Sequence, residues 1–574
     1  MYIDMVPNRS SPPAVLLRES WREGSHIRKR TIANLSDWPA QQIDSLRRLL
    51  RGERLVSAEQ LFVIERSLPH GHVHAVLATI RKLAVDRLLD ARPSRERDLV
   101  LAMMAAQLLH HSSKLADTRL WHTTSLAQQL GVEEADENEL YQALDWLLKR
   151  QPRIEAKLAK RHLTDGGVVY YDVSSSSYEG RTCPLARLGY NRDGKKGLAS
   201  IVYGTLADAE GRPIGMEVYP GDTADPATLI DQVVKLRERF GLKRAVVVGD
   251  RGMVTQAQIE LLRQHPGVGW ITTLRAPMIR ELREKGHLQP SLFDQRNLAE
   301  IQSPDYPGER LIACYNPLMA EERSRKRTEL LEATEKRLVK IKAEIGRRTK
   351  TPLTAADIGV KVGKVLNTYK MGKHFDLTIT DNQLDWTRKS EQIHLEQQLD
   401  GIYVVRTSEP QSSLPAREAV RQYRNLSRVE RIYRTLKGLE ILVRPIRHRS
   451  EDHVRAHLFL CMLAYYVEWH MRHALKPLLF DDEELDGLRR TRDPVARAES
   501  SESAKEKKAS LKTKEGFTAQ SFSTLMHALA SCCVCQCRLK QGGPETSFAQ
   551  ITQLDASQRK AFDLLEVAYP VAAH

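Results

Sequence analysis

The stretch Gly167-Val-Val-Tyr-Tyr-Asp-Val173 decides the fold, because it is a short apolar run with one carboxylate, Asp172, inside it. Its β-branched and aromatic residues occupy both odd and even positions of the run, so they would point to both faces of a strand. This predicts a strand that is buried on both faces. An ionised carboxylate is too costly to leave unpaired in an apolar layer. We therefore expect Asp172 at the open end of the strand, beside a basic group, or as the ligand of a cation.

A second run has the same character. Ala245-Val-Val-Val-Gly-Asp250 predicts a strand that ends in Gly249 and Asp250. If the two strands are neighbours in one sheet, their carboxylates meet at one edge, where like charges raise a pKa unless a metal neutralises them. The pair Asp172 and Asp250 therefore suggests a divalent-metal site.

The sequence between and after these runs predicts the rest of the sheet. The expected elements are strands at 198–206 and 213–219 joined by a turn at 208–211, helices at 223–240 and 255–263, and a fifth strand at 268–273. Three antiparallel strands followed by strand-helix units is the order of a ribonuclease H-like mixed sheet flanked by helices. In that order the first and fourth strands lie side by side, which brings Asp172 and Asp250 together.

A third carboxylate is found on a predicted helix from Pro415 to Lys437, for which Gly438 is a plausible stop. Helical spacing puts Tyr423, Leu426, Glu430, Tyr433 and Lys437 on one stripe, so Glu430 occupies a place where the pattern expects an apolar residue. A glutamate that reaches solvent from the helix flank is the alternative to a ligand. The two aspartates without a partner favour the ligand. Three such carboxylates suit Mg²⁺, with Mn²⁺ as a substitute, and two ions would serve an in-line phosphoryl displacement.

The composition points to a polyanionic partner. The chain has 574 residues, 41% of them hydrophobic, and a formal net charge of +15, which favours nucleic acid. Its start has no signal-peptide pattern and it contains no run of 18 apolar residues, so a cytoplasmic protein is expected. The seven cysteines do not suggest a disulfide framework. Cys532-Cys-Val-Cys-Gln-Cys537 is expected as a strand that places alternate cysteines on one face, rather than as a zinc site.

Four parts are expected along the chain. They are a hairpin at 14–33 and a mainly helical region in 1–160, a catalytic core from 165–275 and 400–475, a large insertion subdomain at 276–399, and a linker with a tail at 476–574. The segment 125–148 is typical either of a helix-turn-helix DNA-binding module or of a plain helix pair. The charged run 319–350 is expected as a helical arm that is solvated or lies on DNA or a partner subunit. Residues 489–516 suggest a flexible linker.

Four motifs resemble the core of DDE transposases encoded by bacterial insertion sequences. They are 171–179 (YDVSSSSYE), 188–195 (LGYNRDGK), 215–225 (GMEVYPGDTAD) and 248–253 (VGDRGM). The matching group has a Tyr, Arg, Glu, Lys signature. Tyr423, Glu430 and Lys437 fit it, whereas Leu426 occupies the arginine position and Arg424 or Arg428 could serve instead.

The resemblance implies that Asp172, Asp250 and Glu430 hold the metal ions for cleavage of transposon ends and for strand transfer into target DNA. It also implies double-stranded DNA as partner and a homodimer that pairs the ends, in the bacterial cytoplasm and on the nucleoid. The expected DNA-binding residues are Tyr423, Arg428, Lys437 and Arg251, with Lys437 on a terminal phosphate and Tyr423 on a base or packed in the helix. A nuclease that cuts without joining and a DNA-binding protein without catalysis are the alternatives.

Overall fold

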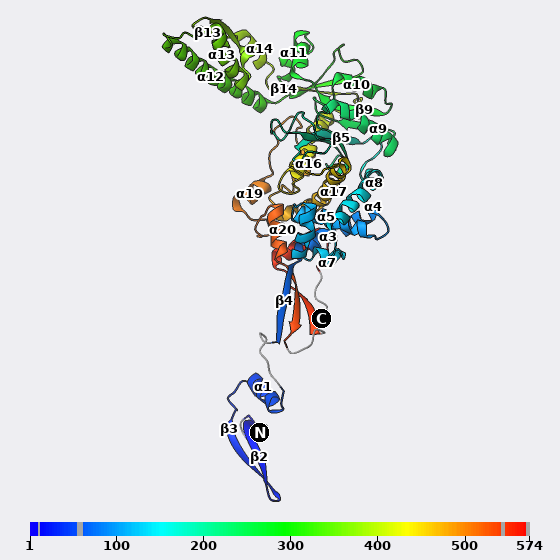
Figure 1. Ribbon diagram of the computed structural model, residues 1–574, viewed down its shortest axis with the longest axis vertical. Helices are drawn as coiled ribbons and strands as arrows, with labels where there is room; N and C mark the ends of the chain where they lie inside the picture. Colours follow the sequence, from blue (N-terminus) through cyan, green and yellow to red (C-terminus); the bar gives the residue numbers. More distant parts are fainter. Residues whose placement is uncertain (10–11, 54–60, 541–545, 570–574) are drawn as a thin grey trace. The chain divides into compact units, whose positions relative to one another are not determined.

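The computed structural model describes residues 1–9, 12–53, 61–540 and 546–569 of the chain. These residues fall into two compact units. The first unit takes residues 1–68 and 532–553, and the second takes residues 69–531 and 554–569. Figure 1 draws the elements of both units in colours that follow the sequence.

The second unit is built on an eight-stranded mixed sheet in the order β10-β11-β14-β9-β8-β5-β6-β7. Its strands are β5 Val168–Ser177, β6 Ser200–Ala207, β7 Pro213–Pro220, β8 Ala245–Val248, β9 Val268–Thr273, β10 Leu298–Ile301, β11 Arg310–Tyr315 and β14 Ile402–Thr407. β5, β6 and β7 are antiparallel neighbours, whereas β5, β8 and β9 run parallel. This is the ribonuclease H-like strand order, so the predicted fold class is confirmed, with β5 beside β8.

The register of the parallel pair sets the two aspartates side by side. Tyr170 of β5 lies opposite Val248 of β8. Two residues further along each strand direction, Asp172 of β5 is therefore level with Asp250, which follows the end of β8. Adjacent strands in a sheet are only about 4.8 Å apart, so the backbones at these two carboxylates are close neighbours.

Alternating side chains of the sheet pack into two separate hydrophobic layers. The helices that cover the sheet are α9 Leu229–Val234 and α10 Gln256–Arg263 on one face, and α15 Ala416–Asn425, α16 Ser427–Lys437 and α17 Glu451–Leu475 on the other. Tyr171 and Val247 pack with α9 and α10, whereas Tyr170 and Val248 belong to the layer of α16 and α17. Because residues two apart on a strand share a face, Asp172 lies on the face that α16 covers.

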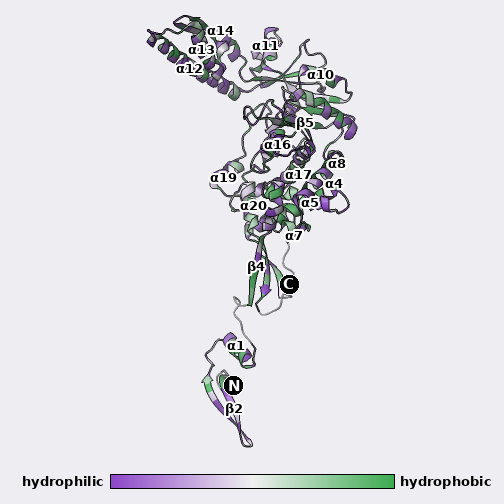
Figure 2. Cartoon of the chain, viewed as in Figure 1, coloured by the Kyte–Doolittle hydropathy of each residue, from purple (hydrophilic) through white to green (hydrophobic). Residues whose placement is uncertain are grey.

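The N-terminal helices share a hydrophobic core with α17. They are α3 Gly71–Lys82, α4 Val85–Leu89, α5 Arg95–Leu109, α6 Lys114–Leu120, α7 Leu126–Leu130 and α8 Glu137–His162. α17 is apolar around most of its circumference, so one side packs on β7 and the others on α5 and α8. Figure 2 shows hydrophobic residues on these helices, whereas α12 of the insertion is more hydrophilic. The pair α7 and α8 buries Leu126, Leu140 and Leu144, which is the behaviour of a core helix pair.

The insertion has two parts. β10 and β11 extend the central sheet through β14, with α11 (Ala276–Glu284) beside them. The second part is an arm made of α12 Pro317–Arg347, α13 Ala355–Tyr369, β12 Phe375–Thr380, β13 Gln383–Arg388 and α14 Ser390–Gln397. This arm has a small core of its own that includes Leu338, Ile358 and Leu384. The charged run therefore forms the long helix that was expected, α12.

Three predicted elements differ from the structure. The helix expected over 415–437 is divided at Leu426 into α15 and α16, because amides there bond to carbonyls three residues back, such as Val429 N–H to Leu426 O at 2.9 Å. The helix expected over 223–240 becomes a 3₁₀ turn (Asp225–Thr228), α9 and a π turn (Lys235–Arg239). Lys235 in that π turn is buried and pairs with Glu217 at 2.7 Å.

The expected linker at 489–516 is the third difference. It overlaps α18 (Leu485–Thr491) and contains α19 (Glu502–Ser510), and α20 (Phe522–Ala530) and α21 (Ala556–Leu565) follow. Ser501 caps α19, and the buried Lys507 donates to three carbonyl oxygens and pairs with Glu483 at 2.6 Å. The polar residues of this segment are thus used in internal contacts, which composition alone does not reveal.

The first unit contains two small antiparallel sheets. One is β1 (Tyr2–Val6), β2 (Ala14–Glu23) and β3 (His26–Asn34), followed by α1 (Ala40–Leu50), and the pairing of β2 with β3 confirms the predicted hairpin over 14–33. The other has the order β16-β15-β4, formed by Ser547–Ile551, Cys533–Leu539 and Phe62–Pro69. The cysteine cluster lies on β15, as expected. Within the described parts of the chain, no helix is long and apolar enough to cross a membrane.

Glu468 on α17 supplies a test of this core. Burial raises the pKa of Glu468 to about 7, although Arg472, whose guanidinium bonds its carboxylate at 3.0 Å, partly offsets the effect. The folded pKa lies above the unfolded value, so the stabilising contribution is complete below about pH 4.5 and is lost as pH rises through about 7. Between pH 4 and pH 8, we expect the free energy of unfolding of the wild type to fall by about 3 kcal/mol relative to that of Glu468→Gln.

Glu451→Gln is the matched control, because Glu451 lies on the same helix with its side chain 43% exposed. This variant is expected to follow the wild type across the pH range. Parallel curves for Glu468→Gln and the wild type would contradict the raised pKa.

Candidate active site

Backbone amides hold the two aspartates at the edge of the sheet. Asp172 Oδ1 accepts a hydrogen bond from the N–H of Val173 at 2.8 Å. Asp250 Oδ1 accepts from the N–H groups of Gly252 and Met253 at 2.9 and 2.8 Å, so the turn after β8 closes around this carboxylate. Both side chains are partly buried.

Tyr433 anchors the helix that carries Glu430. Thr205 of β6 and Asp172 of β5 are register partners, and the Tyr433 hydroxyl lies between their backbones. It accepts from the Thr205 N–H at 3.0 Å and donates to the Asp172 carbonyl oxygen. Glu430 is one turn before Tyr433 on α16, on the same side of the helix, so this bridge brings the Glu430 carboxylate towards Asp172.

The charges of Asp250 and Glu430 act on Asp172. Burial raises the pKa of Asp172 to about 7, and the negative charges of Asp250 and Glu430 contribute to the rise. The hydroxyl of Tyr423 is affected by the same groups: burial raises its pKa, and Asp250 and Glu430 raise it further. Four side chains from β5, the turn after β8, α15 and α16 thus share one neighbourhood.

None of the three carboxylates has a cationic partner among the residues that the structure describes. The contacts of Asp172 and Asp250 are the amide bonds above, and the exposed Glu430 carboxylate has neither a hydrogen bond nor an ion pair. This is unusual in a chain with 88 lysines and arginines. The site therefore concentrates negative charge that the protein itself leaves uncompensated.

A divalent cation fits this donor set in charge and in chemistry, because carboxylate oxygens are hard ligands. In the described residues, however, no group of three or more His, Cys, Asp or Glu side chains is already arranged to hold a metal ion. The carboxylates thus form an electrostatic neighbourhood and not a finished coordination shell. Asp172 and Asp250 are fixed by amides, whereas Glu430 is exposed on its helix.

The predicted DNA-binding residues have two kinds of environment. Lys437 is largely buried, where it donates to the Ser175 carbonyl oxygen at 2.5 Å and pairs with Asp193 at 3.2 Å. Arg428 donates to the Ala209 carbonyl oxygen and to Asp486 at 3.3 Å. Arg251 and Tyr423, by contrast, line a cleft beside the carboxylates.

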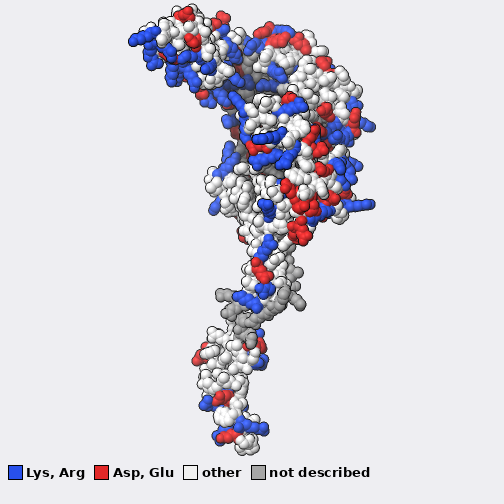
Figure 3. All heavy atoms as spheres, viewed as in Figure 1, with Lys and Arg blue, Asp and Glu red and all other residues white. Residues whose placement is uncertain are grey.

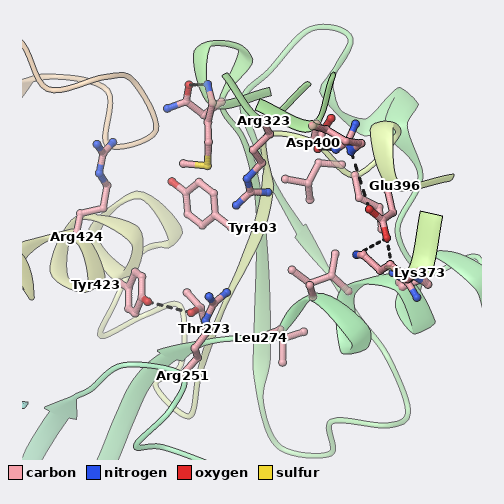
Figure 4. Close-up of a pocket in the computed structure, with 18 residues that line it drawn as sticks. Arg251, Thr273, Leu274, Arg323, Lys373, Glu396, Asp400, Tyr403, Tyr423 and Arg424 are labelled. Atoms are coloured by element: carbon pink, nitrogen blue, oxygen red, sulfur yellow. Dashed lines mark hydrogen bonds and ion pairs between the residues drawn. The ribbon is translucent and has the colours of Figure 1, made fainter. Parts of the chain in front are cut away.

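This cleft has a volume of about 410 Å³ and lies between the sheet end and the insertion arm. In Figure 4, Tyr403 and Arg323 occupy its middle, with Arg251 and Tyr423 nearer the sheet and Lys373 and Glu396 at the arm. The guanidinium groups of Arg251 and Arg323 have no hydrogen bond or ion pair within the described part of the chain. Figure 3 shows further lysines and arginines gathered over α12.

Sequence reasoning missed Asp193 and Arg323. Asp193 Oδ2 accepts from the Ser177 N–H at 2.8 Å, while its Oδ1 pairs with Lys437 and with Arg444 at 2.7 Å. Burial alone would raise the pKa of Asp193, but these partners hold it below its usual value. Its position in the motif at 188–195 was a signal, whereas Arg323 is one of many cations on α12 and nothing in the sequence sets it apart.

Family models identify the chain. The model described as a transposase DDE domain matches residues 172–467, which is just over half of the chain. The chain belongs to the DDE-domain transposases. A second model, described as the N-terminal domain of IS1634 family transposases, matches residues 4–60. The transposase is thus one of the insertion-sequence type, as the motifs implied, and its family cleaves DNA and transfers strands with the help of divalent metal ions.

Comparison with other proteins adds distant likenesses. No curated protein matches the transposase. Among solved structures, it is similar to the piggyBac transposase synaptic complex with hairpin DNA, at 10% identity and a TM-score of 0.32, over 69% of this chain and 72% of that one. It is also similar to the Mos1 transposase paired-end complex with the left transposon end, at 15% identity and a TM-score of 0.14, over 33% and 62% of the two chains.

The Tyr433 bridge can be tested by removing one atom. Tyr433→Phe leaves the Thr205 N–H and the Asp172 carbonyl without their partner, so we expect a loss of about 1 to 3 kcal/mol in the free energy of unfolding. Because α16 then loses its bond to the backbone at Asp172, DNA end cleavage is expected to slow by up to about 100-fold. Chemical denaturation and a single-turnover cleavage assay measure the two effects.

Tyr465→Phe is the control, since Tyr465 is a largely buried residue of α17 whose hydroxyl has no hydrogen bond to any described residue. It is expected to behave as the wild type in both assays. A Tyr433→Phe variant with wild-type stability and cleavage would show that the bridge does not position Glu430.

Proposed function

We propose that Asp172, Asp250 and Glu430 are the catalytic carboxylates of the transposase and that they bind Mg²⁺, with Mn²⁺ as a substitute. The observation that carries this proposal is the uncompensated charge: Asp250 and Glu430 add to the burial that raises the pKa of Asp172, and none of the three carboxylates has an ion pair with a lysine or arginine among the described residues. Mg²⁺ matches such a site because it accepts carboxylate and phosphate oxygens and keeps waters for the remaining positions.

The proposed reaction has two displacements at phosphorus. In the first, a water oxygen attacks the phosphate at the transposon end, the bond to the 3′ oxygen breaks and a free 3′-hydroxyl results. In the second, this hydroxyl attacks a target phosphate, a new phosphodiester bond forms and the target's own 3′ oxygen leaves. Divalent cations supply stabilisation of the attacking and leaving oxygens when bound.

The chain's own groups have distinct parts in this scheme. Asp172 and Asp250 are held by backbone amides, so their carboxylates keep a fixed position at the sheet edge. Glu430 is exposed and has no hydrogen bond or ion pair with any described residue, so it can adjust as DNA and cations enter. Its approach is limited by the Tyr433 bridge, which holds α16 on the sheet.

Arg251 and Tyr423 are proposed as the nearest DNA contacts. Arg251 follows Asp250 directly and its guanidinium lines the cleft, where a phosphate would supply the missing partner. Tyr423 presents a largely buried ring whose hydroxyl accepts a hydrogen bond from Thr273 at 3.0 Å, which favours a packing role beside the DNA. Lys437 and Arg428 are bonded within the protein, so a phosphate contact by either has to share their present acceptors.

A homodimer that pairs two transposon ends, acting on the nucleoid in the bacterial cytoplasm, completes the proposal. Its support is the chemistry: joining both ends of one element to a target needs two active sites held together. The net charge of +15 suits a protein that holds several DNA segments at once.

The carboxylates can be tested with the full-length protein and duplexes that carry the ends of its own element. In Mg²⁺ or Mn²⁺ we expect Asp172→Asn, Asp250→Asn and Glu430→Gln each to reduce end cleavage and strand transfer by more than about 100-fold, because each removes a charged ligand. DNA binding should persist, since the cationic surface is unchanged. Gel analysis of nicked and joined products measures both steps.

Glu418→Gln is the matched control, because Glu418 lies on the neighbouring helix α15 and is paired with Arg421. It should cleave as the wild type does. Retained cleavage by any of the three site variants would remove that residue from the catalytic set, and cleavage without joining by the wild type would favour a nuclease.

Salt dependence tests the proposed contact of Arg251. Each phosphate contact contributes about −0.9 to the slope of log K against log salt. We expect a steep negative slope for the wild type and a slope shallower by about one for Arg251→Ala. Arg263→Ala serves as control, since Arg263 is already paired with Glu309 at 3.2 Å. Equal slopes for Arg251→Ala and the wild type would show that Arg251 does not contact phosphate.

A further inference from the structure

The loop between β5 and β6 presents two large side chains to solvent. Leu188 is 70% exposed and Tyr190 is 78% exposed. Among the described residues, Tyr190 is the most exposed aromatic side chain. An isolated apolar residue at a surface needs no explanation, but an aromatic and an aliphatic side chain two residues apart in one loop do if the loop is rigid.

The loop is indeed fixed to β5. Ser175 Oγ donates to the carbonyl oxygen of Tyr190 at 3.1 Å and accepts from the N–H of Arg192 at 3.0 Å, so one hydroxyl holds the backbone on both sides of residue 191. Asp193 then accepts from the N–H of Ser177 at 2.8 Å. The Tyr190 ring is therefore exposed on a backbone that cannot retract it.

The same contacts place the loop beside the catalytic carboxylates. Ser175 lies three residues after Asp172 on β5, and Asp193 pairs with Lys437 of α16, two turns after Glu430. Tyr190 is thus held by the two elements that carry Asp172 and Glu430.

The charges of the loop indicate what its ring contacts. Arg192 lies 5.4 Å from the centroid of the Tyr190 ring and pairs with Asp225. Lys195 and Arg187 have only long ion pairs, at 3.6 and 3.5 Å. An aromatic face with cations around it is the arrangement by which proteins bind nucleic acid, through base stacking and phosphate contacts. Protein interfaces, by contrast, are depleted in lysine.

We propose that Tyr190 stacks on a nucleobase of the bound DNA next to the scissile phosphate, with Arg192 supporting the ring and Leu188 packing at the same base step. Stacking there fixes the DNA strand relative to Asp172 and Glu430. This inference rests on the proposed catalytic function of those carboxylates, and it adds a DNA-positioning residue that the Tyr, Arg, Glu, Lys signature does not contain.

The experiment uses the full-length protein and duplexes with the ends of its own element, in which a single abasic nucleotide is moved through the positions around the scissile phosphate. Dissociation constants and single-turnover cleavage rates are measured for the wild type, Tyr190→Ala and Tyr190→Phe. Leu261→Ala is the control, because Leu261 is 39% exposed on α10, on the opposite face of the sheet.

On the intact duplex we expect Tyr190→Ala to bind about tenfold or more weakly, whereas Tyr190→Phe and Leu261→Ala bind as the wild type does. At one of the positions tested, the abasic nucleotide should weaken binding by the wild type by a similar factor. At that position it should not weaken binding by Tyr190→Ala any further. This loss of additivity identifies the base that the ring touches.

Two results would overturn the inference. One is wild-type affinity and cleavage for Tyr190→Ala on every duplex, and the other is a set of penalties that simply add at every abasic position. A change in oligomeric state with unchanged DNA binding would assign the ring to a protein contact instead. Failure of the carboxylate proposal is distinguishable, because it shows as retained cleavage by Glu430→Gln and not as a change in binding.

Discussion

One hydroxyl group links the elements on which the active site depends. Tyr433 inserts its phenol between the backbones of Asp172 and Thr205, so it takes part in the ladder of the sheet although it belongs to a helix. The position of α16, and with it Glu430, is therefore determined at the level of Asp172 itself. Lys437 adds a second bond from α16 to β5, at Ser175, but the Tyr433 contact is the one made at Asp172 itself.

The acidic residues of the candidate site differ from those of the surrounding core in their ion pairs. Most acidic residues of the core have a basic partner, such as Glu155 with Lys235 and Asp193 with Lys437. Within the part of the chain that the structure describes, the three candidate catalytic residues have no basic partner, and two arginines of the neighbouring cleft have no acidic partner. A negative centre and a positive cleft thus lie side by side, both uncompensated, which is the pattern expected where cations and a phosphate chain bind together.

Local patterns predicted the strands, because the apolar runs around Asp172 and Asp250 carry their own burial signal. The arrangement of the sheet was predicted from the order of these elements along the chain. The stripe on 415–437 likewise led to Glu430. The division of that helix at Leu426 was not predictable, since it depends on hydrogen bonds that no side-chain pattern records. The defined structure of residues 489–516 was not predicted, for a related reason. Lys507 and Ser501 are polar residues whose hydrogen-bond partners come from elsewhere in the fold.

The small sheet β16-β15-β4 has a consequence for synthesis. β4 ends at Pro69, whereas its neighbour β15 begins at Cys533, so the ribosome makes more than four hundred residues between them. Until the later strand emerges, the nascent chain carries β4 with an open edge. The first unit is therefore completed only after the DDE domain, which contains the candidate catalytic residues, has been made.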